Sequence, residues 1–469
     1  MERKSDLDRL KNGEALSLPQ QLRMIIQLSV PAILSQIASI VMQYIDASMV
    51  GSLGAEAAAS IGLVSSSTWL VMGLGSSASV GFTVQIAHRI GAGEEKEARE
   101  IVRQGLLCVV CFAVALSILA SAVSGRLPFW LGAQETVAAD AGRYFLVFAL
   151  FLPVQQMNYT ASGMLQCSGN MKTPSILNIL MCPLDVLFNF LLIFPGRKME
   201  IAGRTLFVPG AGLGVTGAAL GTGLAQLCVC VLLLGALLIR SPQLHLRRSE
   251  KLHFSAGVLK NAVRIAIPVG FEQVITCGAQ VAQTRIVAPL GTVSIAANSF
   301  AITAESLCYM PGFGVSTAAT TIIGQSIGAG REDLTKRLGW LVTFFGMAVM
   351  AVSGCCMFFA APLMIGILSP DEAIRSLGAE VLRIESFAEP LYAASMVASG
   401  VFRGAGDTLV PSILNFASMW LVRIPLAAFL APRMGLQGVW TAMCLELCVR
   451  GILFLIRLRR SELSGKIRS

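Results

Sequence analysis

The sequence predicts an all-α polytopic membrane protein with twelve transmembrane helices, arranged as two six-helix lobes related by a parallel repeat. Composition is the first observation behind this prediction. Of the 469 residues, 55% are hydrophobic and only 13% are charged, whereas about a quarter of the residues of a soluble domain are charged. Apolar runs of about 20 residues, each long enough to cross roughly 30 Å of hydrocarbon, are the second observation. The third is an internal duplication.

The duplication keeps one register across most of the chain. Pro31 recurs as Pro268, 237 positions later, and the same offset relates residues 91–93 to 328–330 and residues 174–178 to 411–415. Such a period is too long for a solenoid repeat. Each segment lies an even number of spans from its twin, so the halves share one orientation and are related by an axis along the membrane normal. Repeats of this kind place a binding site between or within the halves.

The predicted elements follow in order. A polar cytoplasmic segment, 1–25, precedes the N-lobe, 26–240; a basic linker, 241–261, leads to the C-lobe, 262–457, and a cytoplasmic tail, 458–469, follows. The spans are centred near residues 38, 72, 112, 154, 185, 226, 275, 309, 349, 391, 421 and 447. The first lobe carries an insertion at 195–212, which predicts a small outer hairpin or a loop without function.

The positive charges indicate the topology. The net charge is +9, and most Lys and Arg residues fall in segments on the same side as the N-terminus, such as 240–264 and 457–468. Cytoplasmic loops of membrane proteins carry this excess, which places both termini in the cytoplasm. We therefore attribute the net positive charge to the orientation of the chain in the lipid bilayer, which is its expected partner. We expect no binding to nucleic acid.

The sequence does not predict an enzyme. Most of the twelve cysteines lie in apolar spans without a histidine at zinc spacing, where a thiol is usually a small apolar side chain. A membrane-embedded transferase or protease would need a metal or nucleophile cluster, and the pattern shows neither. We expect no enzyme activity and no cofactor.

Ionisable residues inside the first lobe are the candidates for function, because each costs about 2.5–3.5 kcal/mol on insertion scales. Asp46 lies near the outer end of the first span, without Lys or Arg within a helical turn. Asp185 and Asn189 are four apart in the fifth span and share a helix face. If Asp46 and Asp185 share a wet cavity, they could exchange a proton or bind a small cation. An interfacial position for Asp46, and plain interhelical hydrogen bonding for the other two, are the alternatives.

The second lobe has its own polar side chains within spans. The residues that we predict to contact substrate or coupling ion there are Glu272, Gln280, Glu305 and Glu389. Internal ion pairing with Arg423 or Arg285 is the alternative for the glutamates. We predict a structural ion pair between Glu446 and Arg450, because they are four residues apart in the last span.

Four motifs together are specific to one family. They are Asp46 with Val50-Gly51-x-Leu53-Gly54, residues 310–320, Gly324-Gln325-x-x-Gly328-Ala329-Gly330, and residues 402–408. With these motifs the chain resembles the multidrug and toxic compound extrusion (MATE) family over residues 20–460, and within it the DinF-like bacterial branch. The resemblance implies a monomer in the bacterial inner membrane. It also implies two lobes around a central cavity, and drug or metabolite export driven by inward H⁺ or Na⁺.

The resemblance also implies roles for single residues. Asp46 matches the first-span aspartate tied to ion coupling, Thr222 a sixth-span hydroxyl that lines the same site, and Glu272 a seventh-span acid. The family pattern has Asn and then Asp four residues on in the fifth span, whereas here Asp185 and Asn189 stand in the opposite order. Together Asp46, Asp185, Asn189 and Thr222 could also form a Na⁺ site, so the coupling ion stays open between H⁺ and Na⁺.

The leading expectation is a cation-coupled antiporter that exports amphipathic, cationic organic compounds. One charge moving down 100 mV yields about 2.3 kcal/mol, which supports a concentration ratio of roughly 50-fold. The alternative is a lipid-linked oligosaccharide flippase of related architecture. A flippase would need a basic cavity for pyrophosphate, whereas the charges within these spans are mainly acidic.

Overall fold

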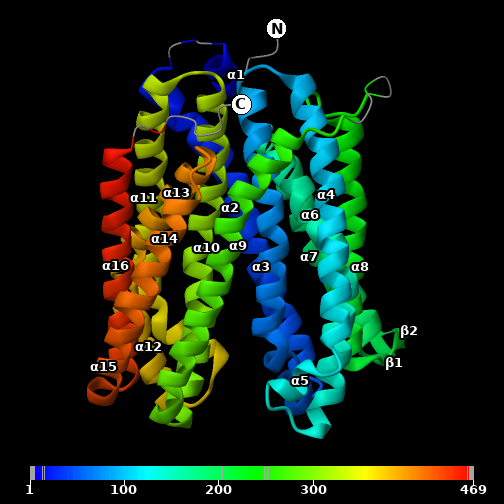
Figure 1. Cartoon of the computed structure of the whole chain (residues 1–469). Helices are drawn as coiled ribbons and strands as arrows, with labels where there is room; N and C mark the ends of the chain where they lie inside the picture. The colour runs from blue at the N-terminus through cyan, green and yellow to red at the C-terminus, as the bar shows by residue number, and fades with distance from the viewer. Residues whose placement is uncertain are drawn as a thin grey trace.

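Six long helices form the N-lobe of the computed structural model (Figure 1). The structure describes residues 6–12, 14, 16–201, 204–247, 250, 253–461 and 463, so parts of the predicted lead-in, linker and tail lie outside it. The helices are α2 (Leu18–Gly51), α3 (Ala55–Gly91), α4 (Glu95–Val123), α6 (Glu135–Cys167), α7 (Lys172–Ile193) and α8 (Gly214–Gly235), with short helices α1 (Asp6–Lys11) and α5 (Leu127–Trp130) and a π-helical turn η1 (Ala236–Arg240). The first span thus begins eight residues before the predicted boundary.

The C-lobe repeats the pattern with more interruptions. Its elements are α9 (Ala256–Val287), η2 (Ala288–Leu290), α10 (Thr292–Gly328), α11 (Glu332–Leu368), α12 (Glu372–Ser386), α13 (Glu389–Gly404), α14 (Leu409–Ala417), the π-helical η3 (Ser418–Arg423), α15 (Ile424–Met434) and α16 (Leu436–Arg460). The break between α12 and α13 falls just before Pro390, which lies in the first turn of α13. Proline is tolerated there because its missing N–H has no partner in a first turn anyway.

Ten of the twelve predicted spans are found as long apolar helices in the described chain. Each is long and apolar enough to cross a membrane. The two other predicted centres, 309 and 391, lie in α10 and α13. The all-helical membrane bundle is confirmed, and the count of twelve spans stays a prediction.

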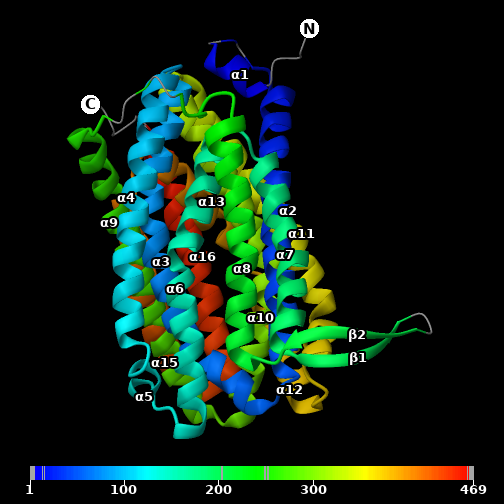
Figure 2. The ribbon, with the colours of Figure 1, turned by 90° about the vertical axis from the view of Figure 1, so that its right-hand side faces the viewer.

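The two ends of the bundle differ. α1 and the last turn of α16 lie at one end, here called the termini side, and the hairpin of β1 (Pro195–Ile201) and β2 (Arg204–Ala211) projects near the other end, here called the hairpin side (Figure 2). The strands pair antiparallel, with Pro195 opposite Ala211. The predicted hairpin is therefore confirmed, and its role stays open.

The repeat is visible as paired contacts between the lobes. A β-carbon on Gly314 would lie 2.6 Å from the backbone nitrogen of Ile33, and one on Gly270 would lie 3.1 Å from Ser77 Oγ. Positions 33 and 270, like 77 and 314, are related by the offset of 237. The α2–α10 and α3–α9 interfaces are thus the same contact made twice, which confirms the parallel repeat.

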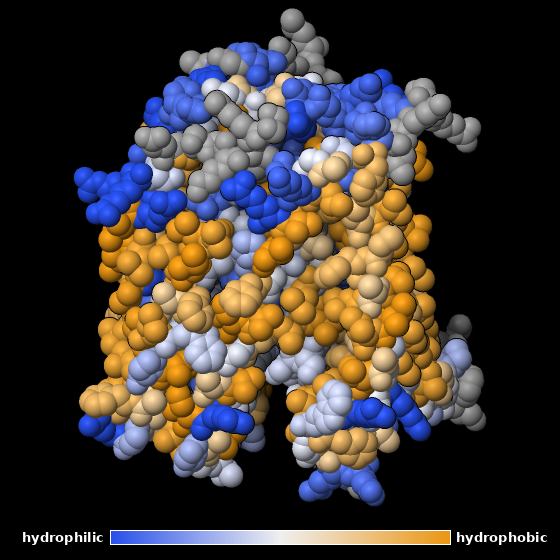
Figure 3. Space-filling model, in the orientation of Figure 1, coloured by the Kyte–Doolittle hydropathy of each residue, from blue (hydrophilic) through white to orange (hydrophobic). Residues whose placement is uncertain are grey.

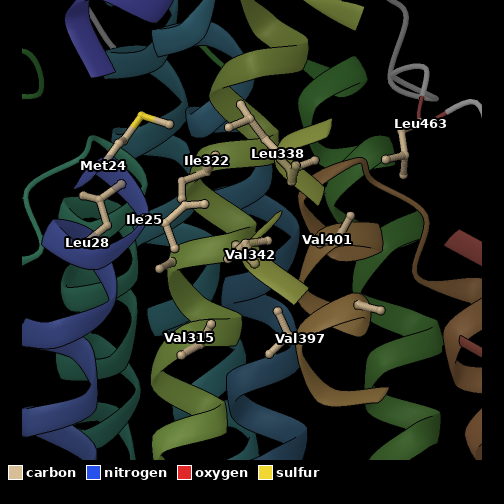
Figure 4. Packing of buried hydrophobic residues seen from close by; sticks show 14 of the residues in the cluster. Met24, Ile25, Leu28, Val315, Ile322, Leu338, Val342, Val397, Val401 and Leu463 are labelled. Carbon is tan, nitrogen blue, oxygen red and sulfur yellow. The ribbon is translucent and has the colours of Figure 1, made fainter. Parts of the chain in front are cut away.

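The lobes join on the termini side and separate on the hairpin side. Apolar side chains from α2, α10, α11 and α13 form one buried cluster that includes Ile25, Ile322 and Val401 (Figure 4). On the face shown in the space-filling view a broad apolar band crosses the bundle, and a cleft divides the two lobes where they end on the hairpin side (Figure 3). The cleft lies opposite the end that carries α1.

Candidate functional site in the N-lobe

Asp46, Asp185 and Asn189 meet inside the N-lobe. The side-chain nitrogen of Asn189 donates to Asp46 Oδ1 at 2.8 Å and to Asp185 Oδ2 at 3.0 Å. The Asn189 amide nitrogen therefore bridges the two carboxyl groups. Asp185 and Asn189 are fully buried, whereas Asp46 is half-buried. The structure therefore brings together the three N-lobe side chains that the sequence singled out.

Helix geometry explains the arrangement. Asp185 and Asn189 stand four apart on α7, so both side chains face α2, which packs along α7. From the other side α8 approaches at Gly221, where a β-carbon would lie only 2.1 Å from Asn189 Oδ1. A glycine is required at this position because any larger residue would displace the Asn189 amide.

The charge balance of this site is unusual for a membrane interior. Among the described residues no Lys or Arg forms an ion pair with Asp46 or Asp185. Asp185 Oδ1 and Asn189 Oδ1 are buried and accept no hydrogen bond in the described chain. Two carboxylates this close repel each other strongly unless a proton or a small cation lies between them. The site can therefore hold a proton, and its two free oxygens could also ligate a small hard cation.

Thr222 is the fourth residue predicted for this site, and the structure does not join it to the other three. It follows Gly221 on α8 and is half-buried, and no hydrogen bond links its hydroxyl to Asp46, Asp185 or Asn189 in the described residues. In addition, the described chain has no cluster of three or more His, Cys, Asp or Glu side chains suited to a metal ion. The predicted Na⁺ site thus has two carboxylates and one amide, without the hydroxyl ligand.

Glu272 forms a separate polar site in the C-lobe. Ser412 Oγ donates to its Oε2 at 3.0 Å and Asn415 Nδ2 to its Oε1 at 2.6 Å. Both partners lie on α14, and Arg403 and Asp407 lie near the same carboxylate. Ser412 and Asn415 belong to the repeated segment 411–415, so the duplication was the signal that could have identified them.

Glu305 and Glu389 lie in another region, deep between α10, α13 and α16. Glu389 and its neighbour Glu385 are each 1% exposed, and none of their carboxylate oxygens accepts a hydrogen bond in the described chain. Among the described residues, none of the acids Glu305, Glu385 and Glu389 forms the ion pair with Arg423 that the sequence offered as an alternative.

Arg423 instead pairs with Glu446. Their charged atoms are 2.6 Å apart, and Arg450 contributes a second contact to Glu446 at 3.0 Å. Ser418, in the π-helical turn η3, donates a further hydrogen bond to the same carboxylate. The predicted pair of Glu446 and Arg450 is confirmed and extends to a buried triad.

Gln280 is exposed on α9, and the structure shows no contact between it and Glu272 or the buried glutamates among the described residues. Arg285 is exposed on the same helix and forms no ion pair in the described chain. The four C-lobe residues of the prediction therefore lie in three separate places and not in one site.

Comparison with known proteins agrees with this architecture. A family model described as MatE matches residues 31–191 and 268–429, which are corresponding parts of the two lobes. The chain belongs to the MATE family. This is a family of transporters, which confirms that the chain is not an enzyme. The finer assignment to the DinF-like branch stays a prediction.

Relatives of this MATE protein match almost end to end. A probable multidrug resistance protein NorM of Thermotoga maritima is 25% identical over 94% of this chain and 92% of its own length. A NorM of the same description from Chromobacterium violaceum is 24% identical, with 97% of both chains covered. A crystal structure of MATE in complex with MaL6 superposes with a TM-score of 0.88 at 19% identity, covering 99% of this chain and 100% of that one. An outward-facing conformation of a multidrug resistance MATE transporter gives a TM-score of 0.87 at 20% identity, covering 99% of both.

Proposed function

We propose that this MATE protein is a monomeric antiporter that exports amphipathic, cationic organic compounds in exchange for an inward cation by alternating access. The observation that carries the proposal is the carboxyl pair of half-buried Asp46 and fully buried Asp185, bridged by Asn189. Binding and release of one cation there changes the charge of a lobe interior, and this is the property that a coupling site needs. The relatives named as multidrug resistance proteins support the class of substrate.

The orientation supports export. We propose that the termini side faces the cytoplasm of the bacterial inner membrane, because the Lys and Arg residues gather there. The cleft of Figure 3 then opens to the outside, as in the related transporter solved in an outward-facing conformation. In this state the cavity releases a compound outward and the coupling ion reaches Asp46 from the outside.

We propose the proton as the coupling ion. The Asn189 amide nitrogen lies between the two carboxyl groups and donates to both, so it occupies the position where a bound Na⁺ would need an oxygen ligand. Hard cations are bound by oxygen atoms in proteins. A proton shared by the carboxyl groups satisfies the same site without any rearrangement of Asn189.

The test uses purified protein in proteoliposomes, with an imposed pH or Na⁺ gradient and ethidium as the transported cation. We expect a pH gradient to drive ethidium transport and Asp46→Asn to reduce it to the level of empty liposomes. Glu56→Gln is the control, because it removes an exposed carboxyl from the first turn of α3 on the same side of the bundle. Transport at the unmodified rate by Asp46→Asn would exclude Asp46 from coupling. Transport driven only by Na⁺ would replace the proton in the proposal.

A further inference from the structure

His88 and Gln325 are equivalent residues in the two halves, and each bonds to the opposite lobe. His88 Nε2 donates to the carbonyl oxygen of Gly404 at 2.7 Å. Gln325 Nε2 donates to the carbonyl oxygen of Cys167, also at 2.7 Å. His88 and Gln325 are 237 positions apart, and so are Cys167 and Gly404. The two hydrogen bonds are therefore one interaction made twice by the repeat.

Each bond joins two helix ends across the lobe boundary. His88 lies in the last turn of α3 and Gly404 ends α13, whereas Gln325 lies in the last turn of α10 and Cys167 ends α6. The last carbonyl groups of a helix have no partner within the helix, so the opposite lobe supplies the missing donors. Both bonds are buried, with Gln325 0% and His88 9% exposed.

Two glycines allow the helix ends to come this close. A β-carbon on Gly91 would lie 2.2 Å from the carbonyl oxygen of Gln325, and one on Gly328 would lie 2.0 Å from that of His88. Gly91 and Gly328 are again equivalent in the repeat. The ends of α3 and α10 thus cross in backbone contact, and the contact brings both donors to their acceptors.

Helix α1 and the apolar cluster of Figure 4 cover the Gln325 side of this region. Leu7, on α1, is part of that cluster, and a β-carbon on Gly169 would lie 2.5 Å from Leu7 and 3.8 Å from the Gln325 amide nitrogen. A solvent-accessible hollow lies beside Lys11 and Gly91, but the side chains of His88 and Gln325 are themselves buried. A hydrogen bond is electrostatically stronger in such a water-poor environment, and breaking it there leaves unpaired groups unless water enters. The two bonds therefore resist separation of the lobes on the termini side.

We propose that His88 and Gln325 are gate-positioning residues, which form a two-bond latch that must break before the cavity opens to the termini side. This inference rests on the proposed alternating access, because only that mechanism requires the lobes to separate at this end. Each bond holds one helix of the N-lobe to one helix of the C-lobe, so the outward-open state keeps both bonds and the inward-open state loses both.

The test measures opening directly, by hydrogen–deuterium exchange with mass spectrometry on the full protein in proteoliposomes. The segments compared are 88–94, 166–171, 325–331 and 403–408. We expect His88→Ala to raise exchange in all four, including 166–171, which does not contact residue 88. Loss of one hydrogen bond worth about 0.5–1.5 kcal/mol predicts a rise of about two- to tenfold. Exchange in the same segments should be higher still in the double variant His88→Ala, Gln325→Ala.

The repeat supplies matched controls. His88→Gln places the residue of the other half at position 88 and should keep exchange close to that of the unmodified protein, whereas His88→Asn is polar but too short and should behave like alanine. His245→Ala is the control for a histidine whose hydrogen bond, to the Ser241 carbonyl, stays within one segment, and it should change none of the four segments. If an alanine variant fails to fold, the comparison of Gln with Asn at position 88 carries the test.

Two results would overturn the latch. One is a rise in His88→Ala that is confined to 88–94, 325–331 and 403–408 and leaves 166–171 unchanged, since a local packing defect at residue 88 gives that pattern. The other is equal exchange in His88→Gln and His88→Asn. The exchange measurement needs no ion gradient and no substrate. If ethidium transport fails but exchange still rises in all four segments, the proposed coupling is refuted and the latch is not. Normal transport without the rise would refute the latch alone.

Discussion

A methyl group added at Gly221 should disturb the candidate coupling site without touching a charged residue. The β-carbon of Gly221→Ala would lie 2.1 Å from Asn189 Oδ1 and 2.9 Å from the Asn189 backbone nitrogen. Real β-carbons essentially never approach another heavy atom closer than 3.0 Å. The Asn189 amide must therefore move by about 1 Å, because α8 is held against α7 along its length.

The size of the effect follows from the hydrogen bonds at stake. Asn189 donates to both Asp46 and Asp185, and a hydrogen bond to a charged group is worth about 1.5–3 kcal/mol. Loss of one of the two bonds corresponds to a change of roughly 10- to 150-fold in the affinity of the site for its cation. We expect Gly221→Ala to shift the pH dependence of ethidium transport accordingly.

Two other glycines of the same segment separate this effect from a general packing defect. A β-carbon at Gly223 would lie 2.5 Å from the ring of Phe151, away from the carboxyl pair, and overpacking of this kind destabilises by about 1–3 kcal/mol. Gly235 has no neighbour within 4 Å, so alanine should be tolerated there. Gly223→Ala should lower the melting temperature and keep the pH dependence of transport. Equal pH profiles for the Gly221 and Gly223 variants would refute the reasoning.

The remaining predictions concern the fifth span, the buried triad and the linker. The double variant Asp185→Asn, Asn189→Asp restores the family order, and unchanged ion preference in gradient-driven transport would show that the order is neutral. Glu446→Gln leaves two buried arginines without their counter-ion, so thermal unfolding should report a loss of about 3–5 kcal/mol, whereas an unchanged melting temperature would contradict the triad's structural role. The Arg99 hydrogen bond holds the pKa of Glu250, in the linker, below its usual range. Ionised Glu250 therefore stabilises its contact with α4 above about pH 4.5, and this stabilisation is lost as the pH falls through the lowered pKa of Glu250. Proteolysis of the linker should rise in acid, and Glu250→Gln should abolish the pH effect.

Sequence periodicity was sufficient for the architecture. The offset of 237 predicted two copies in one orientation, and the structure repeats contacts at that offset, as in the pairs of Gly314 with Ile33 and Gly270 with Ser77. The insertion at 195–212 predicted the hairpin for the same reason. Patterns of this kind are readable because the membrane requires long apolar helices, and a duplicated chain keeps its spacing.

The sequence also placed Asp185 and Asn189 on one face, since residues four apart in a helix always are. It could not show that Thr222 forms no hydrogen bond with them in the described chain, because one helix is free to rotate against another until side chains pack. The same freedom separates Glu272 from Glu305 and Glu389, which the sequence had grouped within one lobe.

The sequence by itself determined the membrane bundle, its duplication and which charged residues lie within the spans. Only the tertiary structure decided which of those charges meet. Asp46 meets Asn189 across more than a hundred residues because α2 and α8 both pack against α7, α8 at Gly221. Arg423 pairs with Glu446 and not with the three buried glutamates of the described chain. Spacing along one helix is set by local geometry, whereas the partner of a buried charge depends on how separate helices pack against one another.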